Sequence, residues 1–130
     1  MTATSASNAW AVGAAFTSIG EKTMILHWNG TKWARVASPN PQGKTAEVTL
    51  DGVAATSASN AWAVGDYATV SGDKSLILHW NGRAWKQVPS PNPGTVNELT
   101  SVAAVSTSNI WAVGDFGSGG PNQVLIAHCC

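Results

Sequence analysis

Three histidines recur at even intervals along the 130-residue chain, and histidine is among the commonest zinc ligands in proteins. His27, His79 and His128 lie 52 and 49 residues apart. Three imidazoles brought to one point could hold a metal ion. However, each histidine occupies the same place in a repeated block of sequence, which predicts that the three lie in separate structural units. We therefore expect hydrogen-bonded structural histidines, with no metal site and no cofactor.

Two adjacent cysteines, Cys129 and Cys130, stand where the preceding repeat has Trp80 and Asn81. They could bind a metal or cross-link two chains. A reducible pair with neither role is the simpler interpretation, and two cysteines are too few for a disulfide framework.

Tryptophans beside an Asn-Gly pair suggest a carbohydrate site, because flat amphipathic rings suit the faces of sugars. The candidate ligand-binding residues are Trp28, Asn29, Trp80, Asn81 and Arg83. The competing interpretation, which we prefer, is that these tryptophans pack in the core and between units.

Catalysis needs an asymmetric set of titratable groups with distinct roles. Here almost every histidine and aspartate is a copy of another, and no Ser/His/Asp order, phosphate loop or pair of glutamates stands out. A sialidase-like hydrolase would also need an arginine cluster, whereas the chain has only Arg35 and Arg83. The sequence predicts a protein that is not an enzyme.

Charged residues make up 11% of the chain, and seven basic residues balance seven acidic ones. This balance gives no electrostatic footprint for nucleic acid or anionic membranes. No apolar run approaches the roughly 18 residues of a membrane helix, and no leader follows Met1. Abundant Thr, Ser and Asn favour an extracellular location, but the absence of a leader gives no support for export, so the location stays unknown.

The elements that carry these residues come in repeats. Residues 5–13 read SASNAWAVG, residues 57–65 repeat them, and residues 106–114 read STSNIWAVG. A second block reads MILHWNGTKWARVASPNP at 24–41 and LILHWNGRAWKQVPSPNP at 76–93, then stops as LIAHCC at 125–130. A period near 50 is typical of four-stranded β-propeller blades.

The second copy contains four strand signals, expected at 48–56, 61–67, 75–80 and 83–88. Asn29-Gly30 and Asn81-Gly82 predict type I′ turns between the third and fourth strands. The Ser-Pro-Asn-Pro segments end the ladder because proline lacks an amide donor. The consecutive apolar residues Leu76 to Leu78 predict burial on both faces. Expected core residues are Trp10, Trp62, Trp111, Val12, Val64 and Val113.

The motifs SASNAWAVG, LILHWNG and SPNP resemble the repeats of long bacterial β-propeller proteins of the Trp-Ala-Val-Gly type, over essentially the whole chain. The hairpin with Gly30 and Trp33 is also distantly similar to the Asp-box hairpin of sialidase-like propellers, except that Trp28 and Trp80 occupy its acidic position. The resemblance implies a fold and no activity.

We therefore expect an all-β chain of about 2.75 propeller blades, at residues 1–41 with a partial first strand, 42–93, and 94–130 without a fourth strand. Propellers usually need about four to eight blades. We expect the chain to be a self-assembling scaffold or interaction module, two copies closing a six-bladed ring, with an open filament as the rival outcome. The expected assembly edge is Leu125, Ile126, His128, Cys129 and Cys130. The alternative function is a lectin with one shallow glycan site per blade.

Overall fold

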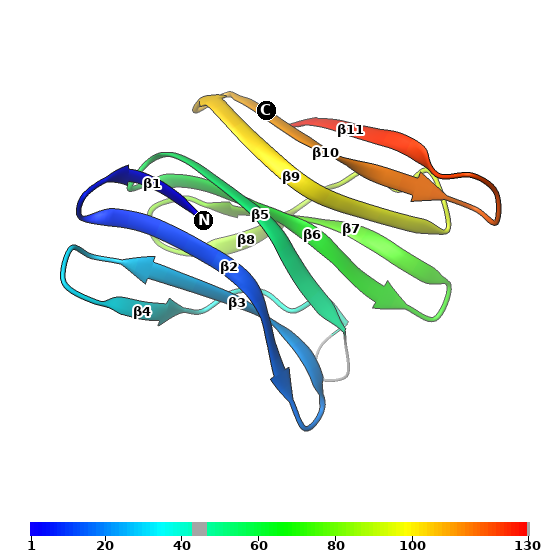
Figure 1. Ribbon diagram of the computed structural model, residues 1–130, viewed down its shortest axis with the longest axis horizontal. Coiled ribbons are helices and arrows are strands. Elements are labelled where there is room, and N and C mark those ends of the chain that lie inside the picture. Colours follow the sequence, from blue (N-terminus) through cyan, green and yellow to red (C-terminus); the bar gives the residue numbers. More distant parts are fainter. Residues whose placement is uncertain (43–46, 130) are drawn as a thin grey trace.

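The computed structural model describes residues 1–42 and 47–129, and within these ranges the chain is all β (Figure 1). The predicted edge residue Cys130 and the start of the predicted second unit, at 43–46, lie outside the described residues.

Three antiparallel sheets follow one another along the sequence. Sheet 1 contains β1 (Thr2–Ser5), β2 (Asn8–Thr17), β3 (Gly20–Trp28) and β4 (Trp33–Val36). Sheet 2 contains β5 (Val48–Ser57), β6 (Asn60–Thr69), β7 (Gly72–Trp80) and β8 (Trp85–Val88). Sheet 3 contains β9 (Val96–Ser106), β10 (Asn109–Gly117) and β11 (Gln123–Cys129).

Each sheet is a meander with the same register, so the sequence repeat is also a structural repeat. Trp62 lies opposite His79 in sheet 2, and the pairs Trp10–His27 and Trp111–His128 take the same places in sheets 1 and 3. The four strands expected in the second copy are all present. In the described ranges, no helix has the length and apolar character needed to cross a membrane.

The Asn-Gly connections differ from the predicted type I′ turns. Gly30 and Gly82 have positive φ, but Asn29 and Asn81 do not. Four residues separate the strands, and the Asn29 Oδ1 atom accepts hydrogen bonds from the backbone amides of Thr31 and Lys32. The type I′ prediction was wrong because the asparagine side chain, which mimics a backbone acceptor, holds a longer turn together.

The Ser-Pro-Asn-Pro segments fold back onto the third strand of their own sheet. In sheet 2, Asn92 Oδ1 accepts from the Ser75 amide at 2.7 Å, and the Ser90 hydroxyl donates to the Ser75 carbonyl at 2.7 Å. Asn40 and Thr23 make the equivalent bond in sheet 1 at 2.8 Å. The motif therefore does more than end the ladder, because it satisfies backbone groups of the third strand beyond the end of the short fourth strand.

The glycine of the Trp-Ala-Val-Gly motif allows a close backbone approach in two of the three sheets. The first strand is bulged opposite this glycine in sheets 2 and 3. A Cβ atom on Gly65 would lie 2.1 Å from the Thr49 carbonyl oxygen, and one on Gly114 would lie 1.9 Å from that of Glu98. At Gly13 such an atom would meet nothing within 4 Å, because β1 pairs only with the beginning of β2.

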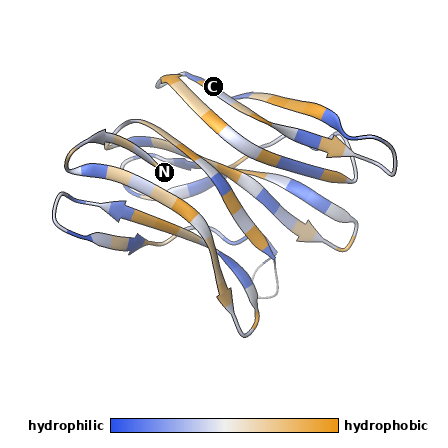
Figure 2. Cartoon of the chain, viewed as in Figure 1, coloured by the Kyte–Doolittle hydropathy of each residue, from blue (hydrophilic) through white to orange (hydrophobic). Residues whose placement is uncertain are grey.

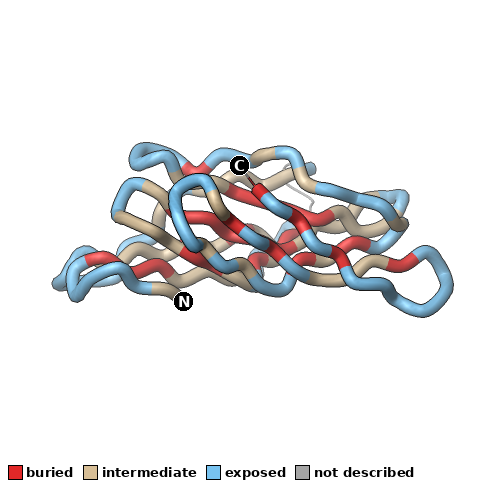
Figure 3. The backbone as a smooth tube through the Cα atoms, turned by 90° about the horizontal axis from the view of Figure 1, so that it is seen from above, coloured by how far each residue is buried: buried red, intermediate tan, exposed pale blue. Residues whose placement is uncertain are grey.

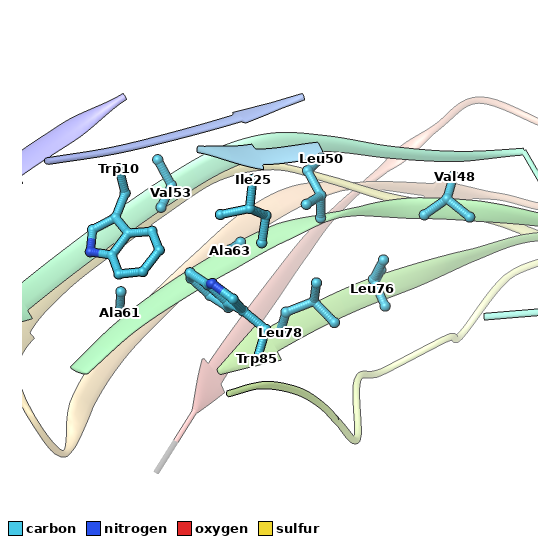
Figure 4. Close-up of a cluster of buried hydrophobic side chains, with 10 residues drawn as sticks. All are labelled: Trp10, Ile25, Val48, Leu50, Val53, Ala61, Ala63, Leu76, Leu78 and Trp85. Atoms are coloured by element: carbon cyan, nitrogen blue, oxygen red, sulfur yellow. The ribbon is translucent and has the colours of Figure 1, made fainter. Parts of the chain in front are cut away.

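Two hydrophobic cores form between consecutive sheets. In the first, Trp10 and Ile25 of sheet 1 point toward Val53, Ala61 and other apolar side chains of sheet 2 (Figure 4). In the second, Trp62, Val64 and Ile77 of sheet 2 pack against sheet 3. Sheet 2 is therefore covered on both faces, and Leu76, Ile77 and Leu78 are all at most 1% exposed, as predicted.

The stacked sheets spread like a fan. The first strands converge, since β5 contacts both β1 and β9, whereas β4 and β8 contact chiefly the third strand of their own sheet. Along β11, the strand that leads to the C-terminus, buried and exposed residues alternate (Figure 3). Sheet 3 thus buries one face against sheet 2 and leaves the other open.

Candidate functional site

The open face of sheet 3 carries the exposed apolar side chains of β10 and β11. We call it the Trp111 face, and its residues are Trp111, Val113, Val124, Ile126 and His128. Trp111 is 45% exposed and Val113 is 42% exposed. Both were predicted to be core. In the single described chain they are exposed because no fourth sheet packs on this face, and their burial in an assembly stays a prediction.

The opposite open face belongs to sheet 1. We call it the Trp28 face, and its residues are Ala11, Met24, Leu26, Trp28 and Trp33. They share one side of the sheet, since Trp28 pairs with Trp33 and Leu26 pairs with Ala11. All five are exposed or half-buried. The Trp28 and Trp33 rings lie 5.8 Å apart and are tilted by 49°.

The two open faces correspond to the two kinds of face that meet inside the chain. Trp111, Val113 and Ile126 occupy the register positions of Trp10, Val12 and Ile25. Trp28 and Trp33 of the Trp28 face occupy the register positions of Trp80 and Trp85, the sheet 2 residues that pack against Trp10. In that internal contact, Trp10 lies 5.2 Å from Trp80 and 5.2 Å from Trp85, and the latter two rings are 5.9 Å apart. The Trp28–Trp33 pair therefore matches the internal receiving pair closely in ring separation.

The recurring histidines take part in one repeated cluster of Asn, His and Trp. His79 stacks on Trp62 at 4.2 Å, and its Nε2 atom lies 2.7 Å from Asn60 Oδ1. The Asn60 amide nitrogen donates to Thr56, so in this orientation His79 Nε2 carries the hydrogen. Equivalent His–Asn bonds occur at His27 (2.6 Å) and His128 (3.2 Å). Each histidine thus bonds within its own sheet.

Burial distinguishes the three clusters. The Nε1 atoms of Trp10 and Trp62 are buried without an acceptor among the described residues. Trp111 Nε1 instead donates to Asn109 Oδ1 at 2.8 Å. Burial lowers the pKa of His79 in the covered cluster of sheet 2.

The predicted ligand-binding residues are separated by the fold. Trp80 is half-buried beside the rings of Trp10 and Trp85, and its Nε1 donates to the Ala58 carbonyl at 3.1 Å. Asn29 and Asn81 use their side-chain oxygens to hold turns. Arg83 is exposed on the turn that follows Asn81.

Carboxylates in β5, β6, β7 and β9 influence one another. Burial raises the pKa of Asp66 to about 6, and repulsion from Glu98, Asp51 and Asp73 adds to this rise, while a hydrogen bond from Thr49 opposes it. Burial, with repulsion from neighbouring carboxylates, also raises the pKa of Glu98. Among residues 1–42 and 47–129, no group of three or more His, Cys, Asp or Glu side chains is placed to hold a metal ion.

Of the predicted edge residues, Leu125 and Cys129 are buried against sheet 2, while Ile126 and His128 are exposed. Trp33 was considered as a sugar-stacking residue alongside Trp28, whereas Leu26 and Met24 of the Trp28 face were not predicted as site residues. Strand alternation was a usable signal, since it places Leu26 and Trp28 on the side opposite Ile25. Which side is covered depends on the order in which the sheets stack.

Comparison with known proteins adds no family to this picture. No family model matches the chain, and neither the curated proteins nor the solved structures compared with it give a match.

Proposed function

We propose that this chain is a non-enzymatic β-propeller repeat module whose three sheets are blades, and that it assembles with further copies of itself. The Trp111 face of one copy packs on the Trp28 face of the next. The chain acts as a scaffold through the assembly so formed.

One observation carries the proposal, namely that both open faces repeat faces that are buried inside the chain. The Trp62 residue of sheet 2 is 2% exposed, and its equivalent Trp111 is 45% exposed. Burying an aromatic side chain of this size is worth about 1.5–3 kcal/mol. A contact that has already formed twice, between sheets 1 and 2 and between sheets 2 and 3, can form again with little rearrangement.

The fan-like spread supports a propeller, because first strands that converge and fourth strands that diverge describe blades around an axis. Two copies of three blades make a six-bladed ring, which lies within the usual range of about four to eight. A ring closes the series of contacts, whereas an open filament continues it.

The direct test is the mass of the particle in solution, measured by light scattering and sedimentation. We expect a dimer, and we expect Trp111→Lys to give a folded monomer by placing a charge in the contact. Val70→Lys is the matched control, since Val70 is fully exposed at the tip of the β6–β7 hairpin and should leave the dimer intact. A wild-type chain that stays a folded monomer at micromolar concentration would refute the proposal.

A glycan-binding function has one supporting observation. Trp33 is 42% exposed beside the half-buried Trp28, and the Nε1 atom of Trp28 is already fixed by a 3.0 Å bond to the Ala6 carbonyl. Trp85 is 4% exposed, against 42% for its equivalent Trp33, so the open glycan site would be the one on sheet 1. A glycan array distinguishes the two functions: binding that is lost in Trp28→Ala, with particle mass unchanged, favours the lectin.

A further inference from the structure

The outer edge of β11 has no partner strand among the described residues. Sheets 1 and 2 each have a short fourth strand on the third, but sheet 3 ends at β11 in the order β11-β10-β9. Val124 is 73% exposed and Ile126 is 60% exposed. Figure 2 shows the apolar stretch of β11 on the outside of this sheet. Backbone donors and acceptors along such an edge can pair with an added strand.

The chain itself shows what kind of strand fits. On β7, Val88 of the fourth strand pairs with Ile77, Lys86 pairs with His79, and Trp85 pairs with Trp80. On β3, the equivalent pairs include Val36 with Ile25. The common pattern of β4 and β8 is tryptophan at the first position and valine at the fourth.

The same register positions exist on β11. Ile126, Ala127 and His128 stand where Ile77, Leu78 and His79 stand in sheet 2. A strand of this pattern would place its valine beside Ile126. Its tryptophan would lie beside Trp62, at one end of the interface between sheets 2 and 3. Trp85 takes the equivalent place in the first core, where its ring lies 5.2 Å from that of Trp10.

The segment after the fourth strand adds a second set of contacts. In sheet 2, Asn92 accepts from the Ser75 amide, and Ser90 donates to the Ser75 carbonyl. Both partners are backbone atoms, so Val124, which occupies the place of Ser75, presents the same donor and acceptor. Only the Ser75 hydroxyl bond to the Pro91 carbonyl is lost.

We propose that the β11 edge is a strand-addition site for an extended peptide of the pattern Trp-x-x-Val-x-Ser-Pro-Asn-Pro. Main-chain pairing supplies the affinity of such sites, and alternate side chains supply the specificity. The backbone pairing uses the edge of sheet 3. Because Ile126 also belongs to the Trp111 face, peptide binding is measured on Trp111→Lys protein, which should not assemble.

The test titrates the isotope-labelled chain with a synthetic peptide of residues 83–93, RAWKQVPSPNP. We expect saturable NMR shifts and slowed amide exchange in β11 from Val124 to His128. Peptides carrying Val88→Asp or Asn92→Ala should bind at least about tenfold more weakly, a difference near 1.4 kcal/mol.

Two protein variants on the Trp111 face separate peptide binding from self-assembly. Ile126→Asp should weaken peptide binding, since Ile126 is the partner of the peptide valine. Trp111→Lys should abolish self-assembly but leave peptide binding unchanged. The proposal is overturned if a scrambled peptide binds equally well, if the shifts fall on the Trp28 face, or if no saturable binding occurs.

Discussion

One asparagine, one histidine and one tryptophan form a cluster that recurs in each sheet. Disrupting a buried cluster should lower the free energy of unfolding more than disrupting an exposed one. In Asn60→Ala the imidazole of His79 loses its acceptor inside a covered cluster. A buried polar group left without a partner costs about 1–3 kcal/mol. We expect a loss of that size in the free energy of unfolding, measured by urea denaturation.

Asn109→Ala is the matched control for that substitution. His128 and Trp111 are exposed in the single chain, so water can replace the lost acceptor. The expected cost is within about 0.5 kcal/mol, as for most surface substitutions. Equal losses at Asn60 and Asn109 would contradict the idea that the covered cluster is the one that stabilises the chain. The comparison is made on Trp111→Lys proteins, so that assembly does not cover His128.

Asp66 should make stability depend on pH. Its pKa is about 6 in the folded chain against its ordinary value of 3.8, so between these values the folded state binds a proton that the unfolded state has released. Stability contributed by the neutral form is therefore fully present below pH 3.8 and is lost as pH rises toward 6. Because the carboxylate is half-buried and screened by solvent, the loss should be about 1 kcal/mol.

Asp66→Asn should remove this loss and make the chain more stable than wild type above pH 6. The difference in unfolding free energy between Asp66→Asn and wild type is followed as a function of pH, because this separates Asp66 from His79. The lowered pKa of His79 makes stability rise with pH, which is the opposite direction. Thr49→Val is a second check, since it removes the hydrogen bond that lowers the Asp66 pKa and should move the window to higher pH. Parallel pH profiles for wild type and Asp66→Asn would exclude the effect.

Strands were largely predictable, because each is specified by local sequence, but the type of the Asn-Gly turn was not. The four strands of the second copy and the double burial of Leu76 to Leu78 followed from period and apolar runs. The Asn-Gly turn was mistaken because the side-chain oxygen of Asn29 competes with backbone turn geometry. The exposure of Trp111 in the single chain did not follow from the sequence, because the repeat pattern is identical whether or not a further sheet covers it. Local sequence therefore specifies a sheet but not its neighbours.

The motif glycine offers a test within the strands. Gly65→Ala places a methyl group against the Thr49 carbonyl in the bulged part of β5. The backbone must move, and overpacking of this kind costs about 1–3 kcal/mol. Gly13→Ala meets open space, so it should be neutral or stabilise the chain by about 0.5 kcal/mol through reduced entropy of the unfolded state. Urea unfolding of both variants measures the contrast.

The three sheets together present two different faces, which makes the proposed association head-to-tail. In such an arrangement Trp111→Lys removes one face and Trp33→Lys removes the other. Each variant should be monomeric alone, because each lacks one half of the contact. A symmetric contact between two Trp111 faces would instead leave the Trp33→Lys dimer intact.

Mixing the two variants gives the decisive result for the assembly. The Trp111 face of the Trp33→Lys chain and the Trp28 face of the Trp111→Lys chain remain intact, so the mixture should form a dimer through one contact. That dimer cannot close or grow, because its outer faces both carry lysine. The wild-type ring forms two such contacts and should therefore dissociate at much lower concentration than the mixed dimer. A wild-type mass that rises steadily with concentration would show that the contacts propagate as a filament and do not close.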